Sequence, residues 1–202
     1  MCGIIGFSTN EPNDENFQLL NKIVAQSKIR GLHSFGYSYY NSELQTKKFH
    51  NLTELDLPKT NKLIYHNRYS TSGDYKDHNN NQPIFNNGIS LVFNGVIDMG
   101  TKEEMQKKYN IKMDSDNDGE ILIKKCGFNK DKILDFVKNM SGSFSGLIMQ
   151  GDKILFVRNT RRPAWMVKKH NATYVASTND IFMRADSSLE PYCTIPNKIY
   201  EL

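Results

Sequence analysis

The feature that most restricts the fold of this chain is the order of its periodic segments. Strand-like segments, short and apolar or alternating, occupy residues 3–8, 35–40, 62–69, 89–93, 143–150, 153–158, 165–168 and 173–177. Helical periodicity covers residues 14–30, 101–109, 118–126 and 130–139. Strands at both ends with helices between them predict an α+β domain in which helices pack on sheets. The sequence shows neither an internal repeat nor a linker, so we expect a single domain over residues 1–202.

Turn residues separate several of these segments. Asn87-Gly88 precedes one predicted strand, and Gly151-Asp152 lies between two others, as expected for tight hairpins. Residues 70–82 are rich in Ser, Gly, Asp and Asn, which predicts a long polar loop. Long loops in compact domains tend to be functional.

Composition narrows the class of protein. The chain has no apolar stretch long enough for a membrane span and no signal-peptide pattern at its start, so no membrane partner is expected. Three widely spaced cysteines, Cys2, Cys126 and Cys193, form neither a disulfide framework nor a metal spacing, which favours a reducing, cytoplasmic location. The net charge of +4 comes from scattered Lys and Arg, which argues against nucleic-acid binding.

Cys2 is the first candidate for chemistry. Aminopeptidases remove an initiator Met when a small residue follows, and removal of Met1 would place a free α-amine on the residue that carries the thiol. An α-amine titrates at about 7.7–8.0 and a thiol near about 8.5, so the amine can act as the base for its own side-chain nucleophile. The alternative is that Cys2 is a small buried hydrophobe at the start of an apolar strand.

Several separated motifs share one resemblance. They are Cys2-Gly3-Ile4-Ile5-Gly6, then Arg30-Gly31-Leu32-His33-Ser34-Phe35-Gly36, then His66-Asn67-Arg68-Tyr69-Ser70-Thr71-Ser72-Gly73, followed by Gln82-Pro83 and Phe93-Asn94-Gly95-Val96-Ile97. The stretches 116–121, 142–145 and 158–163 agree with the same pattern. In order and spacing the chain resembles the class II glutamine amidotransferase domain, found in amidophosphoribosyltransferase, glucosamine-6-phosphate synthase and asparagine synthetase. It departs from that pattern at His33, where Asp is common, at Phe93, where His is common, and around Arg161, where a Gly is missing.

The resemblance implies a four-layer αββα sandwich of the N-terminal-nucleophile hydrolase type and a catalytic group made of Cys2, Asn94 and Gly95. Cys2 Sγ would attack the side-chain amide of glutamine, and its α-amine would move the proton through a water. The Asn94 side-chain amide and the Gly95 backbone N–H would stabilise the oxyanion. The alternative for Asn94-Gly95 is an ordinary hairpin turn.

The resemblance also implies the substrate-binding residues. Arg68 would bind the glutamine α-carboxylate and Asp118 its α-ammonium, while Thr71, Ser72 and Gly73 would lend backbone contacts as the polar loop closes. Taken alone, Arg68 also fits an ordinary surface arginine at a strand end.

The stretch around Asp118 has two alternatives. Asp114, Asp116, Asp118 and Gly119 copy the start of an EF-hand loop, but Lys125 stands where that loop needs a bidentate Glu. The same acidic stretch also suits a helix cap. The remaining histidines lack metal-ligand spacing, so we expect neither a metal nor a cofactor.

The expected function is hydrolysis of glutamine to glutamate and ammonia through a Cys2 thioester, with the ammonia passed to a separate synthase subunit. His66 is interpreted as structural, although it could also be read as a general base for Cys2. Two alternatives remain open. One is a stand-alone hydrolase of a γ-glutamyl or other amide, and the other is a non-catalytic module that keeps the fold and retains Met1.

Overall fold

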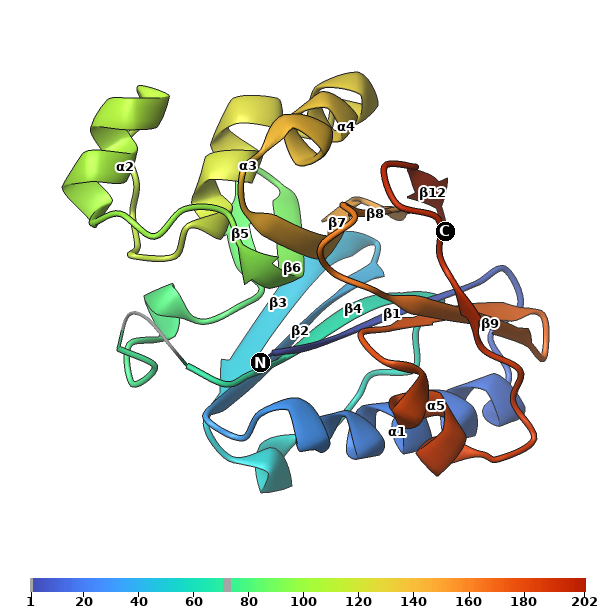
Figure 1. The fold of residues 1–202 in the computed structure, drawn as a ribbon. Helices are drawn as coiled ribbons and strands as arrows, with labels where there is room; N and C mark the ends of the chain where they lie inside the picture. Colours follow the sequence, from blue (N-terminus) through green and yellow to red (C-terminus); the bar gives the residue numbers. More distant parts are fainter. Residues whose placement is uncertain (1, 71–73) are drawn as a thin grey trace.

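A computed structural model describes residues 2–70 and 74–202. Within them, two antiparallel sheets lie face to face, and helices cover the outer face of each sheet (Figure 1). This confirms the predicted α+β class and the αββα layers.

The two sheets differ in size. The larger runs in the order β11 (Tyr192–Cys193), β9 (Trp165–Lys169), β10 (Ala172–Ala176), β1 (Gly3–Thr9), β4 (Lys62–Arg68), β2 (Ser34–Asn41) and β3 (Glu43–Phe49). The smaller runs in the order β12 (Tyr200–Glu201), β8 (Lys153–Arg158), β7 (Ser143–Gln150), β6 (Ile89–Val96) and β5 (Ile84–Asn86). Helices α1 (Asp14–Ser27) and α5 (Asn179–Ala185) pack on the larger sheet, and α2 (Lys102–Tyr109), α3 (Gly119–Cys126) and α4 (Lys130–Asn139) lie over the smaller.

The apolar core has three layers, one under each set of helices and one between the sheets. Strand β1 shows how the sequence builds them, because successive side chains of a strand point to opposite faces. Ile5 and Phe7 pack toward α1, whereas Ile4 enters the layer between the sheets. Burial on both faces explains why this strand is a continuous apolar run rather than an alternating one.

The end of α1 brings a second segment to the start of β1. Asn13 forms a capping box that begins the helix, which ends at Ser27 and continues as a 3-10 turn over Lys28–Arg30. The prediction of helix over 14–30 is therefore right in position but includes this tighter last turn. A Cβ on Gly31 would lie 2.4 Å from the backbone of Arg68, so glycine is needed where the chain passes against β4.

The predicted hairpin between β5 and β6 is confirmed. Asn87 and Gly88 have φ values of 48° and 73°, as a type I′ turn requires. The sequence patterns miss β3, α5 and the two-residue strands β11 and β12. β3 is an edge strand with few buried side chains and two lysines, Lys47 and Lys48, so it lacks an apolar alternation. α5 is only seven residues long.

None of the helices in the described part of the chain has the length and apolar character needed to cross a membrane.

Candidate active site

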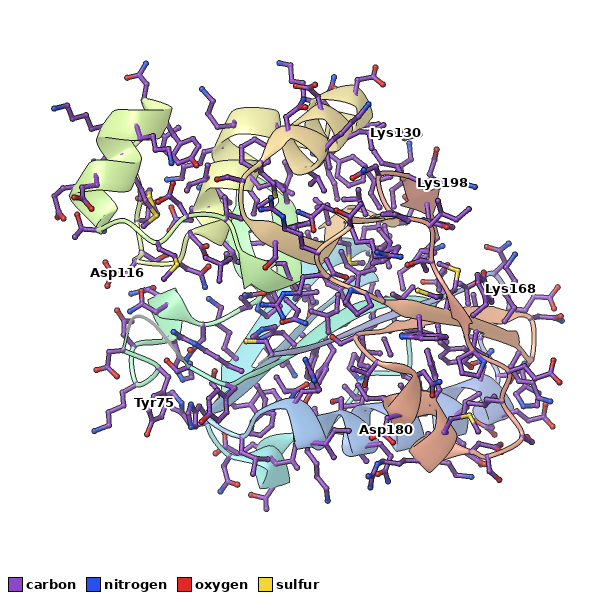
Figure 2. All side chains as sticks on the ribbon, in the orientation of Figure 1. Tyr75, Asp116, Lys130, Lys168, Asp180 and Lys198 are labelled. Atoms are coloured by element: carbon purple, nitrogen blue, oxygen red, sulfur yellow. The ribbon has the colours of Figure 1, made fainter. Side chains whose placement is uncertain are left out.

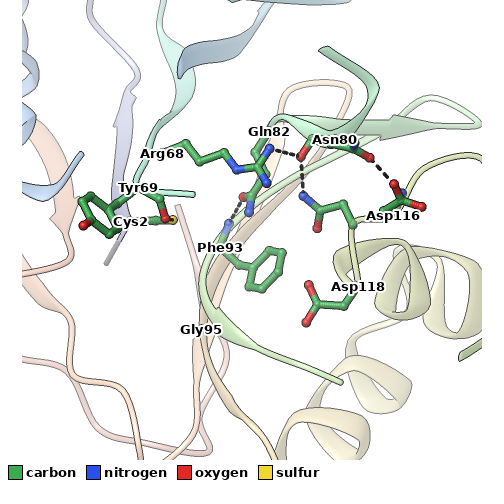
Figure 3. A pocket seen from close by; sticks show the side chains of 10 residues that line it. Cys2, Arg68, Tyr69, Asn80, Gln82, Phe93, Gly95, Asp116 and Asp118 are labelled. Atoms are coloured by element: carbon green, nitrogen blue, oxygen red, sulfur yellow. Dashed lines mark hydrogen bonds between the residues drawn. The ribbon is translucent and has the colours of Figure 1, made fainter. Parts of the chain in front are cut away.

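One pocket collects side chains from both sheets near the N-terminus (Figure 3). It is lined by Cys2, Arg68, Tyr69, Asn80, Gln82, Phe93, Gly95, Asp116, Asn117 and Asp118. In Figure 3, Cys2 and Tyr69 lie on one side of the pocket and Asp118 on the other. The structure thus brings together Cys2, Arg68, Gly95 and Asp118. The predicted contacts of Thr71, Ser72 and Gly73 lie outside the described residues.

Cys2 directly precedes β1 and is partly buried. Its Sγ lies 3.8 Å from the Tyr69 carbonyl oxygen, and the Arg30 side chain donates a hydrogen bond of 3.4 Å to the Cys2 carbonyl. Burial raises the pKa of the Cys2 thiol, and the nearby Arg68 and Arg30 cations oppose part of that rise. A thiol in this setting needs a base to become a nucleophile.

Asn94 and Gly95 lie inside β6, where they pair with Ser145 and Phe144 of β7. The hairpin-turn alternative for these two residues is therefore wrong. Gly95 has φ +154°, and a Cβ there would lie 2.0 Å from the Ser143 carbonyl oxygen, so only glycine fits. Asn94 is 5% exposed, and its side chain forms no hydrogen bond with the described residues. A buried amide without such a bond retains its donors for a ligand.

Arg68 is 7% exposed at the end of β4, so the surface-arginine alternative is wrong. Its Nη1 donates to the Asn80 carbonyl oxygen at 2.9 Å and to Asn81 Oδ1 at 2.6 Å. These bonds fix the plane of the guanidinium at the pocket. Sequence reasoning missed Asn80 and Asn81, and their only signal was a run of asparagines just before Gln82-Pro83.

Asp118 stands at the N-cap position of α3, but its side chain does not cap the helix. Oδ2 accepts hydrogen bonds from the backbone N–H groups of Ile97 (2.6 Å) and Asp98 (3.1 Å). Burial raises the pKa of the Asp118 carboxyl to about 6, although these two bonds counteract the shift. At neutral pH most of this carboxyl is therefore ionised.

The EF-hand alternative is not supported by the arrangement of its carboxylates. Asp114 forms an ion pair with Lys124 at 2.7 Å, while Asp118 is bonded to the backbone after β6. Among the described residues, no three His, Cys, Asp or Glu side chains are grouped so that they could hold a metal ion.

Asn80 joins the two walls of the pocket. Its carbonyl oxygen accepts from Asn117 Nδ2 at 2.9 Å as well as from Arg68, and its Oδ1 accepts from the Asp116 N–H at 2.9 Å (Figure 3). Glu120 of α3 then fixes the same acidic stretch from behind by accepting from Asp114 N at 2.9 Å. The residues around Arg68 and those around Asp118 are thus held at a set separation.

His66 lies outside this pocket, although it is two residues from Arg68. It is fully buried, and burial together with the Arg68 and Lys48 cations lowers its pKa to about 3. Neither ring nitrogen has a hydrogen-bond partner among the described residues. So weak a base is poorly suited to activating a thiol at neutral pH, which favours the structural interpretation.

Solved structures of low sequence identity share this fold. A glutamine phosphoribosylpyrophosphate amidotransferase from B. subtilis, solved with ADP and GMP, superposes with a TM-score of 0.73 at 21% identity over 100% of this chain and 49% of its own. A structure described as the allosteric regulatory enzyme of purine biosynthesis gives 0.79 at 21% identity over 99% of this chain and 46% of its own. The chain therefore spans about half the length of these two proteins. A glutamine aminotransferase class-II domain protein from Silicibacter pomeroyi gives 0.58 at 11% identity, over 100% of this chain and 98% of its own.

Sequence comparison gives one family. No curated protein matches the chain. The model of the glutamine amidotransferase domain matches residues 66–184, a stretch that contains Arg68, Asn94, Gly95 and Asp118. The matched stretch is more than half of the chain, so the chain belongs to the glutamine amidotransferase domain family.

Proposed function

We propose that the chain hydrolyses the side-chain amide of glutamine with Cys2 as the nucleophile, once Met1 has been removed. The observation that supports this most directly is the shared pocket. A thiol, a buried guanidinium, a half-buried carboxylate and Gly95 all line it, although they come from four separate segments. A cysteine that served only as core packing would not need these neighbours.

The polarity of the pocket suits free glutamine. The Arg68 guanidinium would bind the α-carboxylate, and the Asp118 carboxylate would bind the α-ammonium. The bonds from Ile97 and Asp98 occupy Oδ2 of Asp118, so Oδ1 serves the substrate. With both charges of the substrate fixed at these residues, its side-chain amide would extend toward the Cys2 thiol.

In the proposed reaction the Cys2 α-amine takes the thiol proton, and Sγ forms a bond to the amide carbon. The resulting oxyanion is stabilised by the Gly95 N–H and the Asn94 side-chain amide. Collapse of this intermediate breaks the C–N bond, and the departing nitrogen receives the proton and leaves as ammonia. Water then attacks the Cys2 thioester, which releases glutamate and restores the thiol.

The destination of the ammonia is a further part of the proposal. One of the proteins that share this fold is an amidotransferase by description, and an amidotransferase transfers the ammonia to an acceptor. We assign the ammonia to an acceptor synthase on a separate polypeptide. Co-purification of such a partner, with an increase in glutamate release when it is added back, would support this assignment.

Glutamate release from glutamine tests the catalytic proposal. The assay compares the wild-type protein, Cys2→Ala and Cys193→Ala, with intact mass confirming removal of Met1 in each. Cys193 is an exposed free cysteine away from the pocket, so its variant controls for loss of a thiol in general. We expect activity in the wild type and in Cys193→Ala only. Retained activity in Cys2→Ala would contradict the proposal.

A further inference from the structure

His33 is bonded to the strand end that carries Arg68 through both its backbone and its side chain. Its backbone N–H donates to the Arg68 carbonyl oxygen at 3.0 Å. Its ring Nδ1 accepts a hydrogen bond of 2.9 Å from the Ser70 backbone N–H. The residue between these two contacts is Tyr69, whose carbonyl lies beside the Cys2 thiol.

The His33 ring is also stacked between two tyrosines. Its centroid lies 5.0 Å from the Tyr69 ring and 4.9 Å from the Tyr75 ring, with interplanar angles of 23° and 25°. The Tyr75 carbonyl accepts from Asn81 Nδ2 at 2.7 Å, and Asn81 Oδ1 is one of the two acceptors that hold Arg68. Tyr75 and Asp116 lie along the same edge of the molecule in Figure 2. His33 therefore touches both stretches of chain that position the guanidinium.

We infer that His33 is a positioning residue for glutamine binding, acting through the Nδ1 acceptor that holds the Ser70 N–H. This inference rests on the proposed function. His33 stands where the resembling family commonly has Asp. The δ atoms of His and Asp are the same number of bonds from the backbone, and both accept from an N–H group. The exchange of Asp for His therefore keeps a hydrogen-bond acceptor at the same place.

Two variants separate the acceptor from the ring. His33→Phe keeps a stacking ring without an acceptor, and His33→Asn keeps an acceptor at the δ position without a ring. We expect His33→Phe to raise the KM for glutamine about tenfold with kcat changed less than about threefold, and His33→Asn to stay near the wild-type KM. The inference would be overturned if the KM stayed near the wild-type value in His33→Phe and rose in His33→Asn. Ring stacking alone would then explain the role of His33.

Hydrogen exchange at the Ser70 amide, measured without glutamine at one pH, makes the test independent of catalysis. Exchange should be faster in His33→Phe than in wild type and should remain slow in His33→Asn; equal rates in all three proteins would overturn the inference. If the wild type releases no glutamate at all, the proposed function fails, and the exchange measurement still decides the role of Nδ1.

Discussion

Replacing Gly95 with alanine is the sharpest test of the oxyanion site. The added Cβ would lie 2.0 Å from the Ser143 carbonyl oxygen and would require φ near +154°. Cβ atoms essentially never approach other atoms within 3.0 Å, so the backbone must move by about 1 Å or more. A shift of this size would take the Gly95 N–H away from the developing oxyanion. Loss of one such donor costs about 2.7–4 kcal/mol of transition-state stabilisation, or about 10²–10³-fold in kcat.

The assay is steady-state glutamate release by folded protein, with thermal unfolding followed in parallel. Gly151→Ala is the matched control, because Gly151 also has a positive φ (+57°) but has no atom within 4 Å of the added Cβ. It should lose about 1–2 kcal/mol of stability from the left-handed backbone and keep its kcat. A folded Gly95→Ala protein with wild-type kcat would refute the assignment of the Gly95 N–H as an oxyanion donor.

Three other changes test the remaining site assignments. Arg68→Lys keeps the charge but loses the bidentate hydrogen bonding of the guanidinium to the α-carboxylate. The KM for glutamine should therefore rise about tenfold or more, as measured by initial rates. Because the raised pKa means that Asp118 takes up a proton as the pH falls through about 6, the wild-type KM should climb below that pH. Asp118→Asn should show a high KM at every pH, whereas Asp152→Asn, an equal charge change at an exposed turn, should match the wild type. Asn94→Ala should lower kcat more than it changes KM, because its amide is proposed to act on the oxyanion; a pure KM effect would argue against that role.

The elements that the sequence predicts well are those whose pattern is fixed by burial. β1 and β7 are buried along most of their length, and α4 presents Ile133 and Val137 to the core at helical spacing. β3 escapes prediction because an edge strand has one hydrogen-bonded neighbour and little buried surface, so its composition is free to be polar.

The residues of the candidate site likewise include some that the sequence predicts and some that it does not. Motif resemblance identifies Cys2, Arg68, Gly95 and Asp118, and the structure places all four around one pocket. The role of Asn80 could not be predicted, because its bonds to Arg68, Asn117 and Asp116 depend on how two distant segments meet. Two of these bonds, those from Arg68 and Asn117, use the backbone carbonyl oxygen, which every amino acid has. For the same reason, the fit of Gly95 against Ser143 only becomes evident once β6 and β7 are paired.

The most direct test of the central claim is to trap the acyl intermediate. Protein lacking Met1 is mixed with glutamine, quenched in acid within the first turnovers, and digested for mass spectrometry. We predict a glutamyl group on the peptide that begins with Cys2, and its release as the hydroxamate when hydroxylamine is added. Turnover of glutamine without such an adduct, or with the adduct on Cys126 or Cys193, would contradict the assignment of Cys2 as the nucleophile.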